Sequence, residues 1–204
     1  MKLYDGGRAP NPRRVRIFLA EKGVTVPTEQ VDLGQLQQRS DAFTALNPMQ
    51  RVPALVLDDG TVITESIAIC RYLEALRPAP NLFGRDAKET AVIEMWTRRA
   101  EHLTAVPLML AVRHGHPALA ALETQVPEVA ANNRQQADRS LALFDRRLAE
   151  SEWLGADRIT VADGVLFVGF EFARLVRFAI PEALTNLTRW QKAMRERASA
   201  TAGT

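Results

Sequence analysis

Strand signals are confined to the first part of this chain and end at a proline-rich break. The segment Pro78-Ala79-Pro80-Asn81 interrupts the pattern, and from Asp86 onward long alanine- and leucine-rich stretches with helical spacing replace the short β-branched runs. A length of 204 residues is comfortable for two small domains. The sequence therefore predicts a mixed α/β domain at residues 1–78, a linker at 79–86 and an all-helical domain at 87–204.

The α/β part has the pattern strand, helix, strand, followed by a hairpin and a helix. Asp59-Gly60 stands between two β-branched runs, which is a strong hairpin signal. Ser66 is placed to cap the helix that ends before Pro78. A parallel strand pair joined by a helical crossover is right-handed. The expected strands are 2–5, 29–33, 54–57 and 61–63, and the expected helices are 12–22, a polar segment that ends near Leu46, and a segment that begins at Ser66.

Four helical stretches are expected beyond the break, at 87–114, 125–150, 160–177 and 185–199. Pro107 is expected to kink the first of them, because proline removes a backbone donor from a helix interior. The segment Thr160-Val161-Ala162-Asp163 is a capping box in which aspartate replaces the usual glutamate. Asp163 is therefore expected to be structural and not catalytic.

Charge and cysteine content narrow the function classes. The net charge is only +2 and the basic residues are scattered among acidic ones, which is not typical of a nucleic-acid-binding protein. The single cysteine, Cys70, excludes an intramolecular disulfide and is expected to be a buried thiol. His114 and His116 have no cluster of carboxylates or cysteines nearby, so no metal site is expected. A polar N-terminus and the absence of an apolar run of ~20 residues indicate a cytoplasmic protein without membrane association.

Four stretches give a specific signal through their order and spacing. They are LYDGGRAPNPRRVRIFLAEKG, NPMQRVPALVLDDG, TESIAICRYL and ITVADGVLF. Together they resemble the cytosolic glutathione transferases over nearly the whole chain. The resemblance implies a thioredoxin-like N-terminal domain of order βαβ-ββα that binds glutathione, an all-α C-terminal domain, and a homodimer. It implies glutathione as a co-substrate and no other cofactor.

The resemblance also implies how the first domain would hold glutathione. In similar proteins the bond before the residue that matches Pro53 is cis, and the N–H and C=O of Val52 would pair with the cysteinyl part; a trans proline that opens a strand is the alternative. Glu65 would pair with the ligand ammonium and Ser66 with the γ-glutamyl carboxylate, the alternative being a plain helix cap. The candidates for the glycyl carboxylate are Gln50, Gln38, Arg39 and Arg51, of which the arginines are alternatively solvated surface charges.

The group that would stabilise the glutathione sulfur is not a hydroxyl. In relatives that use serine, the hydroxyl lies four residues before the arginine that matches Arg13, and this position is Ala9 here. A subset of relatives directs an asparagine amide from this turn toward the sulfur, which makes Asn11 the candidate catalytic residue. Asn11 is alternatively the N-cap before Pro12. Tyr4 is expected to be a packed strand residue.

The resemblance places a second substrate between the domains. Candidate residues at helical spacing are Trp96, Arg99, Leu103 and Val106, with Phe167 from a later helix; core packing is the alternative for all of them. The expected function is the transfer of glutathione to a hydrophobic electrophile, or disulfide reduction with glutathione as in the nu-like bacterial relatives that use asparagine. The alternative function is a non-catalytic module that binds glutathione or a protein partner on this scaffold.

Overall fold

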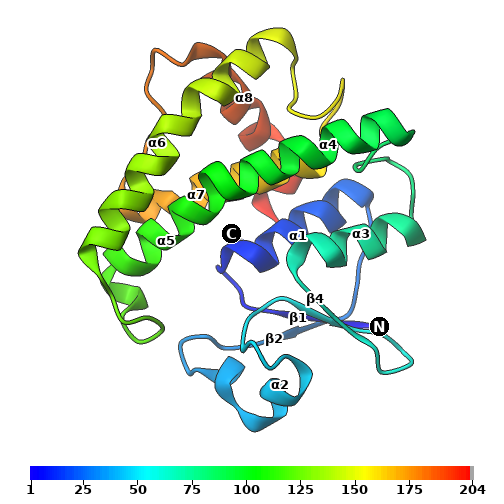
Figure 1. The fold of residues 1–204 in the computed structure, drawn as a ribbon. Coiled ribbons are helices and arrows are strands. Elements are labelled where there is room, and N and C mark those ends of the chain that lie inside the picture. Colours follow the sequence, from blue (N-terminus) through cyan, green and yellow to red (C-terminus); the bar gives the residue numbers. More distant parts are fainter. Residues whose placement is uncertain (203–204) are drawn as a thin grey trace. The chain divides into compact units, whose positions relative to one another are not determined.

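The computed structural model describes residues 1–202, which form two compact units (Figure 1). The first consists of Met1–Pro80 together with residues 198–202, and the second of Asn81–Arg197. The segment expected as a linker at 79–86 is therefore shared between the units, and the end of the chain joins the α/β unit and not the helical one. It does so because Arg13 Nη2 donates to the carbonyl oxygen of Ala200 at 2.9 Å and Ser199 Oγ donates to Glu21.

A four-stranded sheet of order β2-β1-β3-β4 forms the centre of the first unit. β1 is parallel to β2 and antiparallel to β3, which pairs antiparallel with β4. The expected second strand at 29–33 is wrong at its end, because the ladder stops at Gln30 and Val31 packs into an apolar cluster with Phe43 and Val52. The strands are β1 (Lys2–Asp5), β2 (Thr28–Gln30), β3 (Ala54–Val56) and β4 (Val62–Thr64).

Three α-helices cover this sheet: α1 (Pro10–Lys22), α2 (Asp41–Leu46) and α3 (Ser66–Leu76). Figure 1 shows α1 and α3 side by side on one face of the sheet and α2 on the other. Phe43 of α2 packs edge-on against Tyr4 of β1, with ring centroids 6.1 Å apart. The order βαβ-ββα and the prediction of Tyr4 as a packed strand residue are thus confirmed.

The second unit is all-helical, as predicted, but its first long stretch is irregular. α4 (Ala87–Arg99) passes into a π-helical segment, Ala100–Ala105, and then into α5 (Val106–Gly115), which Figure 1 shows as one continuous path. The sequence predicted a kink at Pro107; the structure has a π-helical segment that ends two residues before this proline, which lies in the first turn of α5. The unit is completed by α6 (Pro127–Glu150), α7 (Val161–Ala173) and α8 (Thr185–Glu196).

Asp163 holds the start of α7 from inside the core of the second unit. Its fully buried carboxylate accepts hydrogen bonds from the N–H groups of Thr160 at 2.9 Å and Leu154 at 3.0 Å. It also accepts from the Thr160 hydroxyl at 2.8 Å and from Trp190 Nε1 at 2.9 Å. Burial raises the pKa of the Asp163 carboxyl, and these hydrogen bonds oppose the rise. The capping box and the structural role of Asp163 are confirmed.

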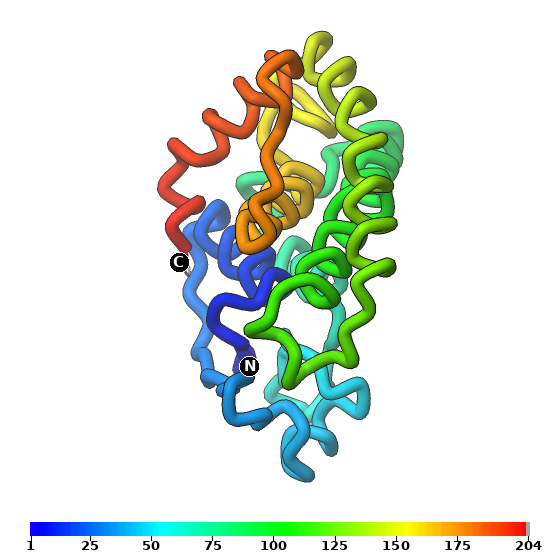
Figure 2. Tube along the Cα trace, turned by 90° about the vertical axis from the view of Figure 1, so that its left-hand side faces the viewer, coloured from blue at the N-terminus to red at the C-terminus, as the bar shows by residue number. Residues whose placement is uncertain are grey.

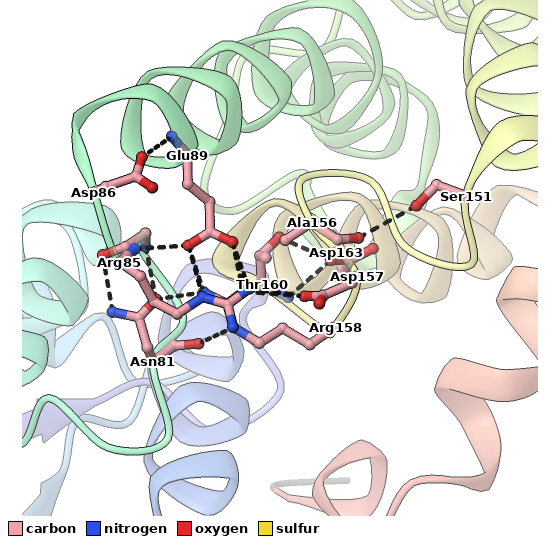
Figure 3. A network of polar contacts seen from close by, with 11 residues as sticks. Asn81, Arg85, Asp86, Glu89, Ser151, Ala156, Asp157, Arg158, Thr160 and Asp163 are labelled. Carbon is pink, nitrogen blue, oxygen red and sulfur yellow. Dashed lines mark hydrogen bonds and ion pairs between the residues drawn. The ribbon is translucent and has the colours of Figure 1, made fainter.

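The segment that enters the second unit is bound to the loop before α7 (Figure 3). Arg158 donates to the backbone and side-chain oxygens of Asn81 at 2.8 and 2.6 Å and to both Glu89 carboxylate oxygens at 2.7 and 3.0 Å. Arg85 Nη2 donates to Glu89 as well, at 2.9 Å. The guanidinium groups of Arg158 and Arg85 hold the pKa of the Glu89 carboxyl well below its usual range. Residues 81–86, expected as a linker, are therefore an ordered part of this unit.

Two glycines of α7 give opposite predictions for the same substitution. A Cβ at Gly164 would meet nothing within 4 Å, whereas a Cβ at Gly169 would lie 2.9 Å from both Cα and Cβ of Ala105. Gly164→Ala is expected to stabilise the protein by about 0.5–1 kcal/mol, because alanine loses less backbone entropy in a helix. Gly169→Ala is expected to destabilise it by about 1–3 kcal/mol, because the backbone of Ala105 has to move. Urea unfolding measures both; shifts of the same sign would contradict the packing argument.

Candidate functional site

Four segments of the first unit meet at one end of its sheet. Tyr4 pairs with Ala54 and Ala54 with Thr64, so the end of β1, the start of β3 and the end of β4 lie together. The parallel pairing of β1 with β2 brings the end of β2 there as well. We call the segments next to these strand ends, 6–11, 31–40, 47–53 and 65–66, the site edge. All the binding and catalytic candidates predicted for the first domain lie on it.

The side chain of Val52 is buried, whereas its backbone N–H and C=O form no hydrogen bond among the described residues. The Val52–Pro53 bond is cis, as predicted. The Val52 side chain is buried in the cluster with Val31 and Phe43, against which Ala9 also packs. Among residues 1–202, the structure gives no hydrogen bond to the N–H or the C=O of Val52. A donor and an acceptor at the end of a sheet are therefore available to an extended peptide.

The loop before Val52 is shaped by the side chain of Asn47, in the turn that the pair Asn47-Pro48 predicts. Asn47 is buried; its Oδ1 accepts from the N–H of Met49 at 3.1 Å and its Nδ2 donates to the carbonyl of Arg51 at 2.6 Å. This is an Asx turn, for which the pair Asn47-Pro48 is a readable signal. Gln50 has a positive φ of 54°, and its Nε2 donates to Thr44 Oγ1 at 3.0 Å. Part of the donor capacity of Gln50 is thus used inside the protein.

The other three candidates for the glycyl end differ in burial. Gln38 lies in the 3-10 helix Gln37–Arg39 and is only 4% exposed. Its Oε1 is buried and has no hydrogen-bond partner among the described residues. Arg39 and Arg51 are exposed on the surface. A buried amide oxygen without a partner is uncommon in a folded protein. As an acceptor it cannot pair with a carboxylate, so only Nε2 of Gln38 could bind the glycyl end.

α3 begins differently from the prediction. The N-cap is Glu65, with φ 66° and ψ 120°, and Ser66 is the first helical residue, so the prediction of Ser66 as the cap is wrong. Glu65 is exposed, whereas Ser66 is buried. A positive φ at a residue other than glycine is unusual and directs the chain sharply into the helix. The first N–H groups of α3 have no partner within the helix and carry the positive end of its dipole.

α1 likewise begins earlier than predicted. Its N-cap is Ala9 and its first residue is Pro10, so Asn11 is the second helical residue and the alternative of Asn11 as N-cap is wrong. Asn11 Oδ1 is buried without a hydrogen-bond partner, and the described residues provide no bond to the other end of its amide. The turn before it is held by Asp5, which accepts from the N–H of Gly7 at 2.7 Å and pairs with Arg16. Asn11 thus stands at a fixed helix start with an uncommitted amide.

Arg13 is engaged with the end of the chain. Figure 2 shows the C-terminal segment, coloured red, beside the dark blue α1, and the Arg13 guanidinium donates to the carbonyl of Ala200 in that segment. Arg13 therefore also holds the C-terminal segment against α1, a role that the sequence did not indicate.

The candidates for the second substrate have different environments within the second unit. Trp96 is buried and packs against Phe144, with ring centroids 6.0 Å apart. The guanidinium of Arg99 lies 4.7 Å from the Trp96 ring centroid, which is a cation–π distance. Phe167 is 1% exposed, Leu103 is half-buried, and Val106 is exposed. The structure thus places Trp96 and Phe167 in a core, which was the alternative stated for them.

Other titratable groups have structural explanations. Cys70 is buried, as predicted, and burial raises the pKa of its thiol. His114 Nδ1 and His116 Nδ1 accept from the N–H groups of Val126 and Ala118. Within residues 1–202, no group of three or more histidine, cysteine or acidic side chains is arranged to hold a metal ion. No helix in the same range has the length and apolar character needed to cross a membrane.

Comparisons with known proteins agree with this architecture. Residues 9–76 match the family described as Glutathione S-transferase, N-terminal domain, and residues 101–198 match Glutathione S-transferase, C-terminal domain. Glutathione S-transferase 2 of Saccharomyces cerevisiae is 35% identical over 203 residues, which cover 98% of this chain and 87% of that protein. Glutathione S-transferase GstA of Escherichia coli O157:H7 is 31% identical over 89% of this chain and 86% of its own.

A solved structure matches this chain over nearly its whole length. A crystal structure of a glutathione S-transferase domain-containing protein from Marinobacter aquaeolei VT8 superposes with a TM-score of 0.94 at 40% identity, over 98% of this chain and 100% of that chain. Sequence and structure thus agree in both units. The chain belongs to the glutathione S-transferase family and is an enzyme of that family.

Proposed function

We propose that the protein, as one subunit of a homodimer, binds glutathione along the site edge, stabilises its thiolate, and transfers it to a hydrophobic electrophile or uses it to reduce a disulfide. The observation that carries this proposal is the free backbone N–H and C=O of Val52 beside two helix starts. The cysteinyl part of glutathione has one N–H and one C=O, and pairs with Val52 as an added strand next to Pro53.

The γ-glutamyl end of glutathione carries an ammonium and a carboxylate. The carboxylate meets the first N–H groups of α3 and the hydroxyl of Ser66, where the helix dipole favours negative charge. The exposed carboxylate of Glu65 pairs with the ammonium. The positive φ of Glu65, which is unusual for a residue other than glycine, occurs where this arrangement needs the residue.

The glycyl carboxylate lies toward segments 31–40 and 47–53. Gln38 is the preferred donor, because its amide is buried and no hydrogen bond among the described residues uses its Nε2. Gln50 already donates to Thr44 and contributes less. Arg39 and Arg51 supply exposed positive charge, which attracts the carboxylate at a distance but is screened by salt.

The sulfur is stabilised by Asn11 Nδ2 and the start of α1. A thiol with a pKa of ~8.5 needs a shift of about two units to be mostly ionised at neutral pH, which corresponds to about 2.7 kcal/mol. A hydrogen bond to a charged acceptor contributes roughly 1.5–3 kcal/mol and a helix start roughly 0.3–1 kcal/mol. The sum is sufficient without the hydroxyl that is missing at Ala9. No separate base is required, because stabilising the anion lowers the pKa of the thiol.

The thiolate can then react in either of two ways. In conjugation, the sulfur forms a C–S bond with an electrophilic carbon, and the displaced electron pair leaves with a leaving group or takes up a proton. In disulfide reduction, the sulfur attacks one disulfide sulfur and expels the other as a thiolate; a second glutathione resolves the mixed disulfide and leaves oxidised glutathione. Arg99, Leu103 and Val106 are the proposed contacts for the second substrate, and Trp96 and Phe167 support them from the core.

Titration of the wild-type protein with glutathione, followed by the ultraviolet absorbance of the thiolate, tests the proposal. We expect saturable binding, thiolate formation below the pH at which free glutathione ionises, and turnover with an aromatic electrophile or a small disulfide. Binding without turnover in either assay would favour the alternative of a non-catalytic binding module. Absence of binding would reject the assignment of the site edge.

A further inference from the structure

Two side-chain contacts join α1 and α3 and show the direction in which these helices run. Arg14 Nη1 donates to Ser66 Oγ at 3.4 Å, and eight residues further along both helices Lys22 pairs with Glu74. Contacts at the same spacing on both helices mean that α1 and α3 are parallel, with their first residues at the same end. The start of α1 at Asn11 and the start of α3 at Ser66 therefore lie on the same side of the unit.

Arg14 lies between these two helix starts. It follows Asn11 by three residues, about one helical turn. Its side chain is only 5% exposed, and the Ser66 side chain that it meets is equally inaccessible. A guanidinium is permanently charged, so Arg14 places a buried positive charge near the first residues of α1 and α3.

The chemistry of this contact decides what Ser66 can do. A guanidinium offers donors only, so Ser66 Oγ must accept from Arg14. A hydroxyl whose oxygen lone pair is used in this way keeps its own proton for donation to another acceptor. The hydroxyl is thereby oriented as a donor, and the nearby positive charge adds to the dipole of α3 in a region of low dielectric constant.

We propose that Arg14 is a positioning residue for the γ-glutamyl carboxylate: it sets Ser66 as a donor and raises the positive potential at the start of α3 without touching the ligand. This inference rests on the proposed function, in which that carboxylate binds at Ser66. Lys22 of the same helix has no such role. It lies at the far end of α1, where it pairs with Glu74 and donates to the carbonyls of Arg77 and Pro80.

The test compares two ligands, glutathione and cysteinylglycine, which lacks the γ-glutamyl group. In the wild type, glutathione is expected to bind more tightly than the dipeptide. Arg14→Gln is expected to weaken glutathione about tenfold, or about 1.4 kcal/mol, and to leave the affinity for cysteinylglycine within about twofold. Arg14→Lys keeps the charge but not the fork of donors, and is expected to lose about threefold in the same direction. Isothermal titration calorimetry at one salt concentration measures the affinities of all three proteins for both ligands.

Two further comparisons distinguish positioning from mere support of the fold. Ser66→Ala combined with Arg14→Gln should lose little more than either single variant, because both act on one carboxylate. Lys22→Gln is the matched control: it should lower the unfolding midpoint without changing the ratio of the two affinities. If Arg14→Gln does not fold, Arg14→Lys and its combination with Ser66→Ala give the same comparison.

The outcomes separate this inference from the function on which it rests. Equal affinity of the wild type for both ligands would reject the proposed binding of the γ-glutamyl group, and the inference with it. A clear wild-type preference that persists in the Arg14 variants would overturn the role of Arg14 alone. Equal weakening of both ligands would also overturn it, because that result indicates a general loss of structure.

Discussion

Replacing Asn11 by alanine is expected to raise the pKa of the bound glutathione thiol by about one to two units, which corresponds to the loss of one hydrogen bond to a charged sulfur. The amide of Asn11 has no hydrogen bond within the described protein, so its removal breaks no internal hydrogen bond. The start of α1 remains and retains part of the stabilisation. At neutral pH a rise of the bound pKa from about 6.5 to about 7.5–8.5 should lower the thiolate fraction, and with it the rate, about 3- to 25-fold.

The prediction is checked by following thiolate absorbance against pH in the glutathione complex. Below the pKa of the bound thiol, Asn11→Ala and the wild type should bind glutathione equally well, because the lost bond acts on the anion only. Asn11→Asp is the matched variant of the same shape: its carboxylate repels the thiolate and should raise the pKa further. An unchanged pKa in Asn11→Ala would remove Asn11 from the mechanism.

The parts of the site that could be predicted are those with a local sequence signal. The cis bond before Pro53 and the position of Glu65 and Ser66 followed from motifs at a known spacing. Their local geometry was less predictable. Two prolines near the start of α1 left its first residue ambiguous, and Pro10, not Pro12, opens the helix. At Glu65 a positive φ takes the place of the side-chain cap expected from Ser66.

The features that could not be predicted join residues far apart in the chain. Arg14 meets Ser66 across 52 positions, and Arg13 meets Ala200 across 187. An arginine near a helix start looks like a surface charge in the sequence, and only packing shows that Arg14 is buried. The close approach of Gly169 to Ala105, the last residue of the π-helical segment Ala100–Ala105, is a further case, because it depends on tertiary packing.

The largest loss of stability is expected from Asp163→Ala. The substitution leaves four buried donors without an acceptor: the N–H groups of Thr160 and Leu154, the Thr160 hydroxyl and the Trp190 indole N–H. Each unsatisfied donor costs roughly 1–3 kcal/mol where it cannot find water, and breaking a buried charged cluster typically costs about 3–5 kcal/mol. This is a large share of the 5–15 kcal/mol that is typical of a folded domain, so the helical unit should be partly unfolded near physiological temperature.

Urea unfolding at neutral pH measures the effect, and a second capping aspartate of the same unit provides the control. Asp86 caps α4 through one bond from the N–H of Glu89 at 2.8 Å and is exposed. Asp86→Ala should cost only about 0.5–2 kcal/mol, as is usual for a helix cap. Asp163→Asn keeps one carbonyl oxygen but places an NH₂ group next to other donors. Its loss of stability should therefore lie between those of Asp163→Ala and Asp86→Ala. If Asp163→Ala cost no more than Asp86→Ala, the buried carboxylate would be an ordinary cap, and the core of this unit would not depend on it.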